Sequence, residues 1–175
     1  MRCHRPSFGQ GGGTCPNLKL ALQLSRILTK CPPSILAALQ FAEVKEELGV
    51  IDVLIFNPGL KSPSILNTDI MDIKIEEFNA THQLFCAGAL LCVQEVLPDM
   101  VAKSGDATTK KGTILFTGAT AGYRGSAKGA IYSAAEFGMR SLSQSVARGY
   151  ASKGIHCCFF RLDCVIDTPW VVAMM

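Results

Sequence analysis

The chain alternates between short, continuous apolar runs and longer stretches in which apolar residues recur every three or four positions. The apolar runs predict buried strands at residues 50–56, 113–117 and 155–160. The longer spacing is typical of helices that bury one face, and it predicts helices over residues 34–49, 75–103 and 130–152. Gly49 and Gly154, at two of the predicted helix ends, are suited to stop a helix.

Strands and helices therefore alternate from about residue 34 onward. A strand, a helix and a second strand in sequence form a right-handed unit with parallel strands, so we predict an α/β fold with a three-layer parallel sheet flanked by helices. Such folds bind ligands at the carboxyl ends of their strands. Asn57 and Gly59 follow the first strand there, although they also suit a plain tight turn. Tyr132, at the start of the last helix, is a potentially catalytic side chain.

Length, charge and cysteine usage narrow the class of protein. A chain of 175 residues, of which 49% are hydrophobic, corresponds to one domain with a sizeable core. A net charge of +3, without a basic cluster interleaved with aromatic residues, argues against a nucleic-acid partner. No uninterrupted apolar run approaches the ~20 residues that cross a bilayer, so we predict no membrane partner. The eight cysteines show no CxxC spacing, and we interpret them as buried, reduced thiols of an intracellular protein.

Residues 1–33 form a poorly defined segment that carries basic side chains and no acidic one. Two interpretations stay open: a mitochondrial transit peptide, favoured by the leucine-rich stretch from Leu18 to Leu28, and an ill-defined start of the chain. The glycines between Gly9 and Thr14 lack the preceding strand and the later carboxylate that a dinucleotide loop needs, so we interpret them as a linker. The expected location is cytoplasmic, with a mitochondrial one as the alternative.

Three motifs follow one another in a specific order. An Asn-Pro-Gly turn lies at 57–59, Tyr132 precedes Glu136 by four residues, and the segment DCVIDTP occupies 163–169. In order and spacing they resemble the Asn-Asn-Ala-Gly turn, the Tyr-x-x-x-Lys pair and the Pro-Gly-x-x-x-Thr segment of the short-chain dehydrogenase/reductase family. The resemblance extends over about residues 34–169. It implies a Rossmann-like fold and the reduction of carbonyls or oxidation of alcohols with NAD(P).

The resemblance also implies which residues bind the cofactor. They are Asn57, Gly59, Thr117, Ile166 and Thr168. In the family, two strand–helix units with a glycine-rich pyrophosphate loop come before the position of Ser34, and residues 1–33 do not resemble them. We therefore expect a partial domain over residues 34–175 with incomplete N-terminal units and weak NAD(P) binding.

Of four catalytic positions in the family, the chain shares only Tyr132. The lysine corresponds to Glu136, the serine thirteen residues before the tyrosine to Ala119, and the asparagine of the long helix to Phe85. A carboxylate one helical turn from a tyrosine raises the tyrosine pKa, whereas the lysine lowers it. Whether Thr120, next to Ala119, replaces the serine hydroxyl is left open.

The resemblance predicts an NAD(P)-dependent oxidoreductase. The three substitutions predict that its catalysis is impaired, so that the chain is a pseudoenzyme. The alternatives are a non-catalytic, dimerising relative and a truncated gene fragment without redox activity. In the family, the helices that correspond to Ile75–Lys103 and Ala130–Ser152 pair across a two-fold axis, so we expect a homodimer. His82 lies in an apolar stripe and is expected in the core or an interface. The carbonyl or alcohol substrate and the choice between NAD and NADP stay undetermined.

Overall fold

The structure of the chain, a computed structural model, describes residues 33–59, 63–105 and 108–163. Its principal elements follow in the order α1 (Pro33–Leu48), β1 (Val53–Phe56), α2 (Ile75–His82), α3 (Gly88–Ala102), β2 (Gly112–Ala119), α4 (Ala130–Tyr150) and β3 (Ile155–Leu162). Short turns of tighter helix are η2 (Pro63–Leu66), η3 (Ile70–Asp72), η5 (Thr120–Gly122) and η6 (Ala151–Lys153). The predictions for residues 1–32 lie outside the described residues.

The described strands form one parallel sheet in the order β1-β2-β3. Val53 of β1 lies opposite Thr113 of β2, and Gly112 lies opposite Ile155 of β3. Each connection between neighbouring strands contains a helix, as parallel strands require. The predicted α/β fold, a parallel sheet flanked by helices, is confirmed.

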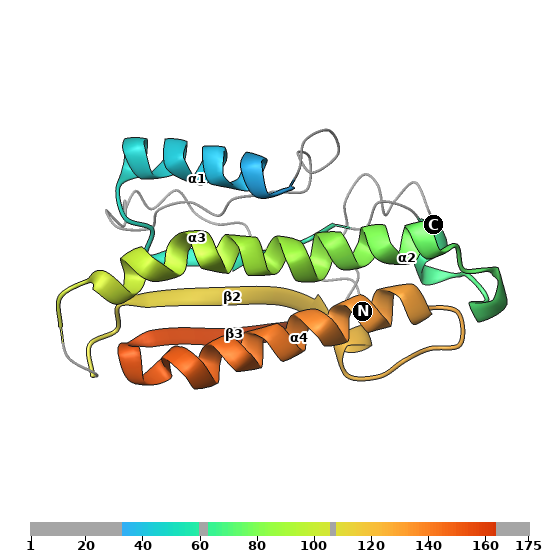
Figure 1. The fold of residues 1–175 in the computed structure, drawn as a ribbon. Helices are drawn as coiled ribbons and strands as arrows, with labels where there is room; N and C mark the ends of the chain where they lie inside the picture. The colour runs from blue at the N-terminus through green and yellow to red at the C-terminus, as the bar shows by residue number, and fades with distance from the viewer. Residues whose placement is uncertain (1–32, 60–62, 106–107, 164–175) are drawn as a thin grey trace, which may run out of the picture.

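The described helices share one face of this sheet. Side chains alternate between the two faces of a strand, and on β2 the buried Ile114 and Phe116 point toward the helices, into a core shared with Phe41 of α1. Leu115, between them, lies on the opposite face and is half-buried. Figure 1 shows α3 and α4 lying along the sheet, with α1 on the other side of α3, and α4 packs against α2 and η4 (Gln83–Ala87).

Strand β1 begins later, and strand β2 ends later, than the sequence predicted. β1 begins at Val53, because Val50 follows the left-handed Gly49 (φ 75°) and is 44% exposed. β2 continues past residue 117 to Ala119, because Gly118 and Ala119 still pair with Arg161 and Leu162 of β3. The predicted helix stop at Gly154 is confirmed, since this residue has a left-handed φ of 83°.

The predicted long helix is present, with one interruption. A π-helical turn, η4 (Gln83–Ala87), joins α2 to α3. The whole segment, Ile75–Ala102, is long enough to span a membrane, and its most apolar 18-residue window has a mean hydropathy of 1.6. The segment also contains charged residues that break its apolar run. Half of its most apolar stretch is buried against the rest of the protein, as in the core helix of a soluble fold, so membrane insertion has only weak support.

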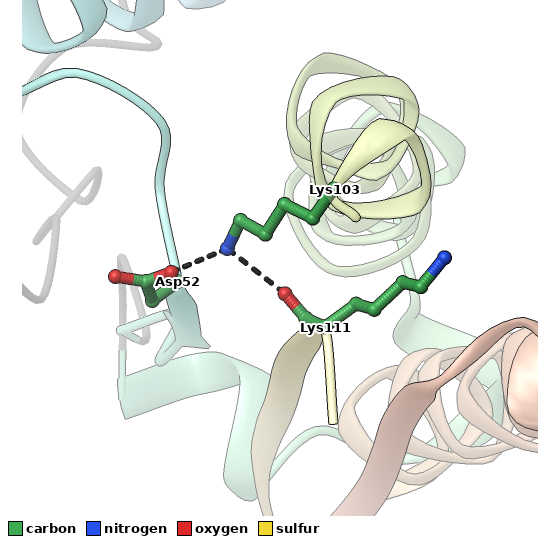
Figure 2. A network of polar contacts seen from close by, with 3 residues as sticks. All are labelled: Asp52, Lys103 and Lys111. Carbon is green, nitrogen blue, oxygen red and sulfur yellow. Dashed lines mark hydrogen bonds and ion pairs between the residues drawn. The ribbon is translucent and has the colours of Figure 1, made fainter. Parts of the chain in front are cut away.

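An ion pair joins the amino edge of the sheet to the end of α3 (Figure 2). Lys103 Nζ contacts the Asp52 carboxylate just before β1 and donates a 2.8 Å hydrogen bond to the Lys111 carbonyl just before β2. The Asp52 carbonyl accepts a 3.0 Å hydrogen bond from the Thr113 backbone N–H. One lysine therefore fixes the end of a helix to the starts of two strands.

Candidate functional site

Tyr132 lies in the first turn of α4 and is half-buried. Its ring packs edge-on against Phe85, with centroids 5.8 Å apart and an interplanar angle of 84°. Phe85 belongs to the π-helical turn η4 and is 1% exposed. Such turns are frequent at functional sites. Here, the position that the resemblance assigns to an asparagine holds an apolar ring that closes against the tyrosine.

Glu136, one helical turn after Tyr132, is 1% exposed. Its carboxylate accepts a 3.0 Å hydrogen bond from the Ala119 backbone N–H and a second one from the Tyr132 hydroxyl. The absence of a side chain at Gly118 makes room for it, because a Cβ there would lie 2.5 Å from Glu136 Oε2. The carboxylate thus fastens the first turns of α4 to the carboxyl end of β2.

The pKa values of Tyr132 and Glu136 are both raised, so the neutral form of each side chain is favoured. Burial raises the pKa of Glu136 above its ordinary 4.5, although the hydrogen bonds from Ala119 and Tyr132 act against this rise. Burial, the Glu136 charge and the hydrogen bond to Glu136 together raise the Tyr132 pKa above 10.0. The ion pairs of the described residues do not include Glu136. The predicted effect of a carboxylate at this position on the tyrosine pKa is confirmed in direction.

Thr120, the possible substitute for the missing serine, lies in η5 directly after β2. Its hydroxyl donates to the Asp163 carboxylate, which also pairs with Arg161 at 2.9 Å. The hydroxyl is therefore directed toward the end of β3. At the serine position itself, Ala119 contributes a backbone N–H, and Glu136 already accepts from it.

The predicted cofactor residues occupy two strand ends. Asn57 and Gly59 are exposed just after β1. Phe56 lies opposite Phe116, so Thr117 is level with the start of the Asn57 turn at the same edge of the sheet. Because Gly118 faces Glu136, the neighbouring Thr117 side chain lies on the other face of the sheet.

Ile166 and Thr168, the other two predicted cofactor residues, lie outside the described residues. His82 is half-buried, stacks on Phe78 with centroids 4.5 Å apart, and has Nδ1 3.4 Å from the Phe78 carbonyl oxygen. Its ring contact and its close polar contact are therefore with Phe78 of the same helix.

The described cysteines and acidic residues do not form a metal centre. No group of three or more His, Cys, Asp or Glu side chains lies close enough to hold a metal ion within the described ranges. Cys92 and Cys157 are buried free thiols, as predicted, and burial raises the pKa of each to about 12. Such thiols are poor nucleophiles.

Four side chains at the carboxyl edge were not predicted from the sequence. Tyr123, at the end of η5, lies within cation–π distance of Arg140 from α4 and of Arg161 from β3, and Arg161 pairs with Asp163. Tyr123, Arg140 and Arg161 belong to none of the sequence motifs, and Asp163 begins the 163–169 segment, so the fold brings the four together.

The residues around Tyr132 do not fit the catalytic part of a nicotinamide site. Stabilising a tyrosinate needs a nearby positive charge, and the group one helical turn away is a buried carboxylate. Of the predicted cofactor residues, Asn57 and Gly59 lie exposed in the turn at the end of β1. No reaction step can be derived from this arrangement.

Comparison with known proteins identifies the family. The model of the family described as short chain dehydrogenase matches residues 36–170. The chain is 29% identical over 114 residues to the short-chain dehydrogenase/reductase eriH of Hericium erinaceus, covering 65% of this chain and 42% of eriH. It is 30% identical over 124 residues to the 3-oxoacyl-[acyl-carrier-protein] reductase FabG of Escherichia coli, covering 71% of this chain and 46% of FabG.

A solved structure agrees with this match. Sorbitol-6-phosphate 2-dehydrogenase SrlD from Erwinia amylovora superposes with a TM-score of 0.70 at 26% identity, over 81% of this chain and 52% of SrlD. The chain thus spans about half the length of the relatives it matches. The sequence match covers most of the chain and the fold agrees with it, and on these grounds the chain belongs to the short-chain dehydrogenase family.

Proposed function

We propose that this chain is a catalytically impaired short-chain dehydrogenase, descended from enzymes that interconvert carbonyls and alcohols with NAD(P). The observation that carries the proposal is the Glu136 carboxylate, buried at the lysine position and hydrogen-bonded to both Tyr132 and the Ala119 N–H. Together with burial of the ring, this carboxylate raises the Tyr132 pKa and so keeps the tyrosine neutral. It also occupies the backbone donor at the serine position. Proton transfer through Tyr132 is therefore disfavoured at neutral pH.

Weak NAD(P) binding is part of the same proposal. Asn57 and Gly59 are exposed just after β1, where a bound cofactor would contact them. In the family, the lysine that meets the nicotinamide ribose stands where this chain has Glu136, whose carboxylate is committed to protein donors. The exposed turn supports contact with a cofactor, and the substituted position supports low affinity.

Calorimetric titration with NADP(H) and NAD(H), followed by an assay of diketone reduction, tests this function. We expect dissociation constants above about 10 μM, equivalent to a binding free energy weaker than roughly −7 kcal/mol, and turnover at background. Glu136→Gln, which keeps both hydrogen-bonding positions without the charge, is the matched variant and should remain near background, because Ala119 still offers no hydroxyl. Robust turnover by the unmutated chain would refute the proposal.

A non-catalytic, dimerising role is the second candidate. Large apolar side chains are exposed on both helices that pair in the family, among them Leu90 on α3 (42%) and Phe137 on α4 (43%). Exposed apolar side chains on adjacent helices are suited to an isologous interface. We infer that these helices support a homodimer.

Sedimentation of the chain tests the second candidate. A concentration of about 50 μM is high enough for a dimer with a micromolar dissociation constant to form. Phe137→Glu should shift the chain toward monomer. Val50→Glu, a charge at a similarly exposed valine in the turn between α1 and β1, is the control and should leave the dimer intact. A wild-type monomer at that concentration would remove the dimer proposal and leave the catalytic one untouched.

A further inference from the structure

Two arginines from distant parts of the chain converge on one exposed tyrosine. The Arg140 guanidinium carbon lies 4.0 Å from the Tyr123 ring centroid, and that of Arg161 lies 5.1 Å from the same centroid. Tyr123 is 41% exposed and packs edge-on against Phe159 with centroids 5.9 Å apart. The ring is thus held by β3, and α4 and β3 each place a positive charge beside it.

The cluster of Tyr123, Arg140 and Arg161 carries more positive charge than its described partners neutralise. Asp163 pairs with Arg161 at 2.9 Å, and this carboxylate is shared with the Thr120 hydroxyl. The described contact of Arg140 Nη1 is the neutral Gly122 carbonyl, at 3.2 Å. Since a guanidinium has five N–H donors, most donors of Arg140 are left over for another acceptor.

The surrounding chain adds to this positive potential. Between residues 108 and 163 the acidic side chains are only Glu136, which is buried, and Asp163. The basic residues of this stretch are Lys110, Lys111, Arg124, Lys128, Arg140, Arg148, Lys153 and Arg161. A field of one sign attracts oppositely charged ligands. Arg124 and Lys128 are exposed in the loop that follows Tyr123, so they extend the same field.

The cluster also lies where ligands reach this type of fold. Tyr123 ends η5, and Arg161 lies near the end of β3, both at the carboxyl edge of the sheet. Guanidinium forks match phosphate and carboxylate oxygens with paired hydrogen bonds. A phosphate suits a pair of guanidinium groups better than a carboxylate does, because it offers more oxygens and more charge.

We propose that Tyr123, Arg140 and Arg161 form a binding site for an oxyanion, with a phosphate group preferred over a carboxylate. The ring fixes the two guanidinium groups by cation–π contact, which limits the rotamer freedom lost when an anion binds. The site shares no residue with Tyr132 and Glu136, although Arg140 lies one helical turn after Glu136 on α4. Anion binding there needs no hydride transfer. It gives the chain a ligand whether or not the redox chemistry survives.

The test is an NMR titration of the arginine Nε–H resonances with inorganic phosphate at pH 7 and constant ionic strength. The Arg140 and Arg161 signals should shift saturably with a common midpoint of about 1–10 mM, equivalent to roughly −3 to −4 kcal/mol. Arg148, exposed on α4 outside the cluster, is the internal control and should shift little and linearly. Equal, unsaturable shifts of all three arginines would overturn the proposal.

Two variants and a second anion sharpen the result. Arg161→Gln should weaken phosphate binding at least tenfold, whereas the matched Arg148→Gln should leave the midpoint unchanged. Arg140→Lys, which keeps the charge but removes the fork, should weaken binding by a smaller factor. Acetate should bind more weakly than phosphate, and equal midpoints for the two anions would contradict the phosphate preference. An unchanged midpoint in Arg161→Gln would contradict the site itself.

Discussion

The two edges of the sheet each hold a carboxylate, in opposite circumstances. At the amino edge, Asp52 is about half-exposed and pairs with Lys103. At the carboxyl edge, Glu136 is almost fully buried and takes its hydrogen bonds from a backbone N–H and a tyrosine hydroxyl. The first carboxylate lies partly in water beside a cation, while the second is buried among neutral partners.

The difference shows what a buried carboxylate does when its surroundings are neutral. A half-exposed ion pair is worth at most about 1 kcal/mol, because water screens it. A buried carboxylate bound by neutral donors favours its own protonation and opposes ionisation of its neighbours. The ion pair at the amino edge therefore mainly fixes the end of α3 relative to the starts of β1 and β2. The carboxyl edge holds a hydrogen-bonded contact at the position where the family places a catalytic charge.

The largest effect is expected from filling the space that Glu136 uses. Gly118→Ala places a Cβ against the Phe159 ring and 2.5 Å from Glu136 Oε2, so the unfolding free energy should fall by about 3 kcal/mol. Gly149→Ala is the control, because nothing lies within 4 Å of its Cβ and it lies in α4. The unfolding free energy of Gly149→Ala should rise by about 0.5 kcal/mol. Urea denaturation measures both, and equal stability of the two variants would show that the carboxyl edge is loosely packed.

A smaller loss is expected when the carboxyl group itself is removed. Glu136→Ala leaves the Ala119 N–H without its acceptor at the end of β2, and should cost about 2 kcal/mol. Glu136→Gln keeps an acceptor for Ala119 and a second polar group for Tyr132, so at neutral pH it should be at least as stable as the wild type. A loss in Glu136→Gln as large as in Glu136→Ala would mean that the negative charge itself stabilises this edge.

The pH dependence of stability should separate the two edges further. Because the folded-state pKa of Glu136 is raised, the folded chain binds a proton more tightly than the unfolded chain. This contribution to stability is fully present below the ordinary pKa of 4.5 and is lost as the pH rises through the folded-state value. The difference in unfolding free energy between Glu136→Gln and the wild type should therefore grow with pH above 4.5. A difference independent of pH would contradict the raised pKa.

The smallest effect is expected at the amino edge. Asp52→Asn removes one charge of a half-exposed pair, while Lys103 keeps its hydrogen bond to the Lys111 carbonyl. The loss of unfolding free energy should be at most about 1 kcal/mol and should shrink at high salt. Thermal unfolding at low and high ionic strength measures it. A loss larger than that of Glu136→Ala would reverse the proposed ranking of the edges.

The sequence predicted most of the fold because each principal element has a local signal. Apolar runs placed the strands, and the left-handed glycines at 49 and 154 stopped the helices at the predicted positions. The hydrophobic pattern failed to predict the end of β2, where pairing with the neighbouring strand decides the structure. Gly118 and Ala119 continue β2 because β3 lies beside them, although their composition suggests a loop.

The sequence predicted the residues Tyr132 and Glu136 of the site, but only some of the contacts that they make. Tyr132 and Glu136 are one turn apart on a helix, so their mutual effect followed from spacing. The hydrogen bond from Ala119 to Glu136 and the direction of the Thr120 hydroxyl depend on how η5 turns after β2. The convergence of Arg140 and Arg161 on Tyr123 joins three elements that no short-range pattern connects.

The central claim is that burial and the Glu136 carboxylate together keep Tyr132 neutral. A ¹³C NMR titration of the Tyr132 ring carbon bonded to the hydroxyl tests it directly, in the wild type and in Glu136→Gln. In the wild type, the phenol should stay protonated well above its ordinary pKa of 10.0, and in Glu136→Gln the midpoint should fall, because the charge of Glu136 is gone. A wild-type midpoint at or below 10, or the same midpoint in both proteins, would contradict the account.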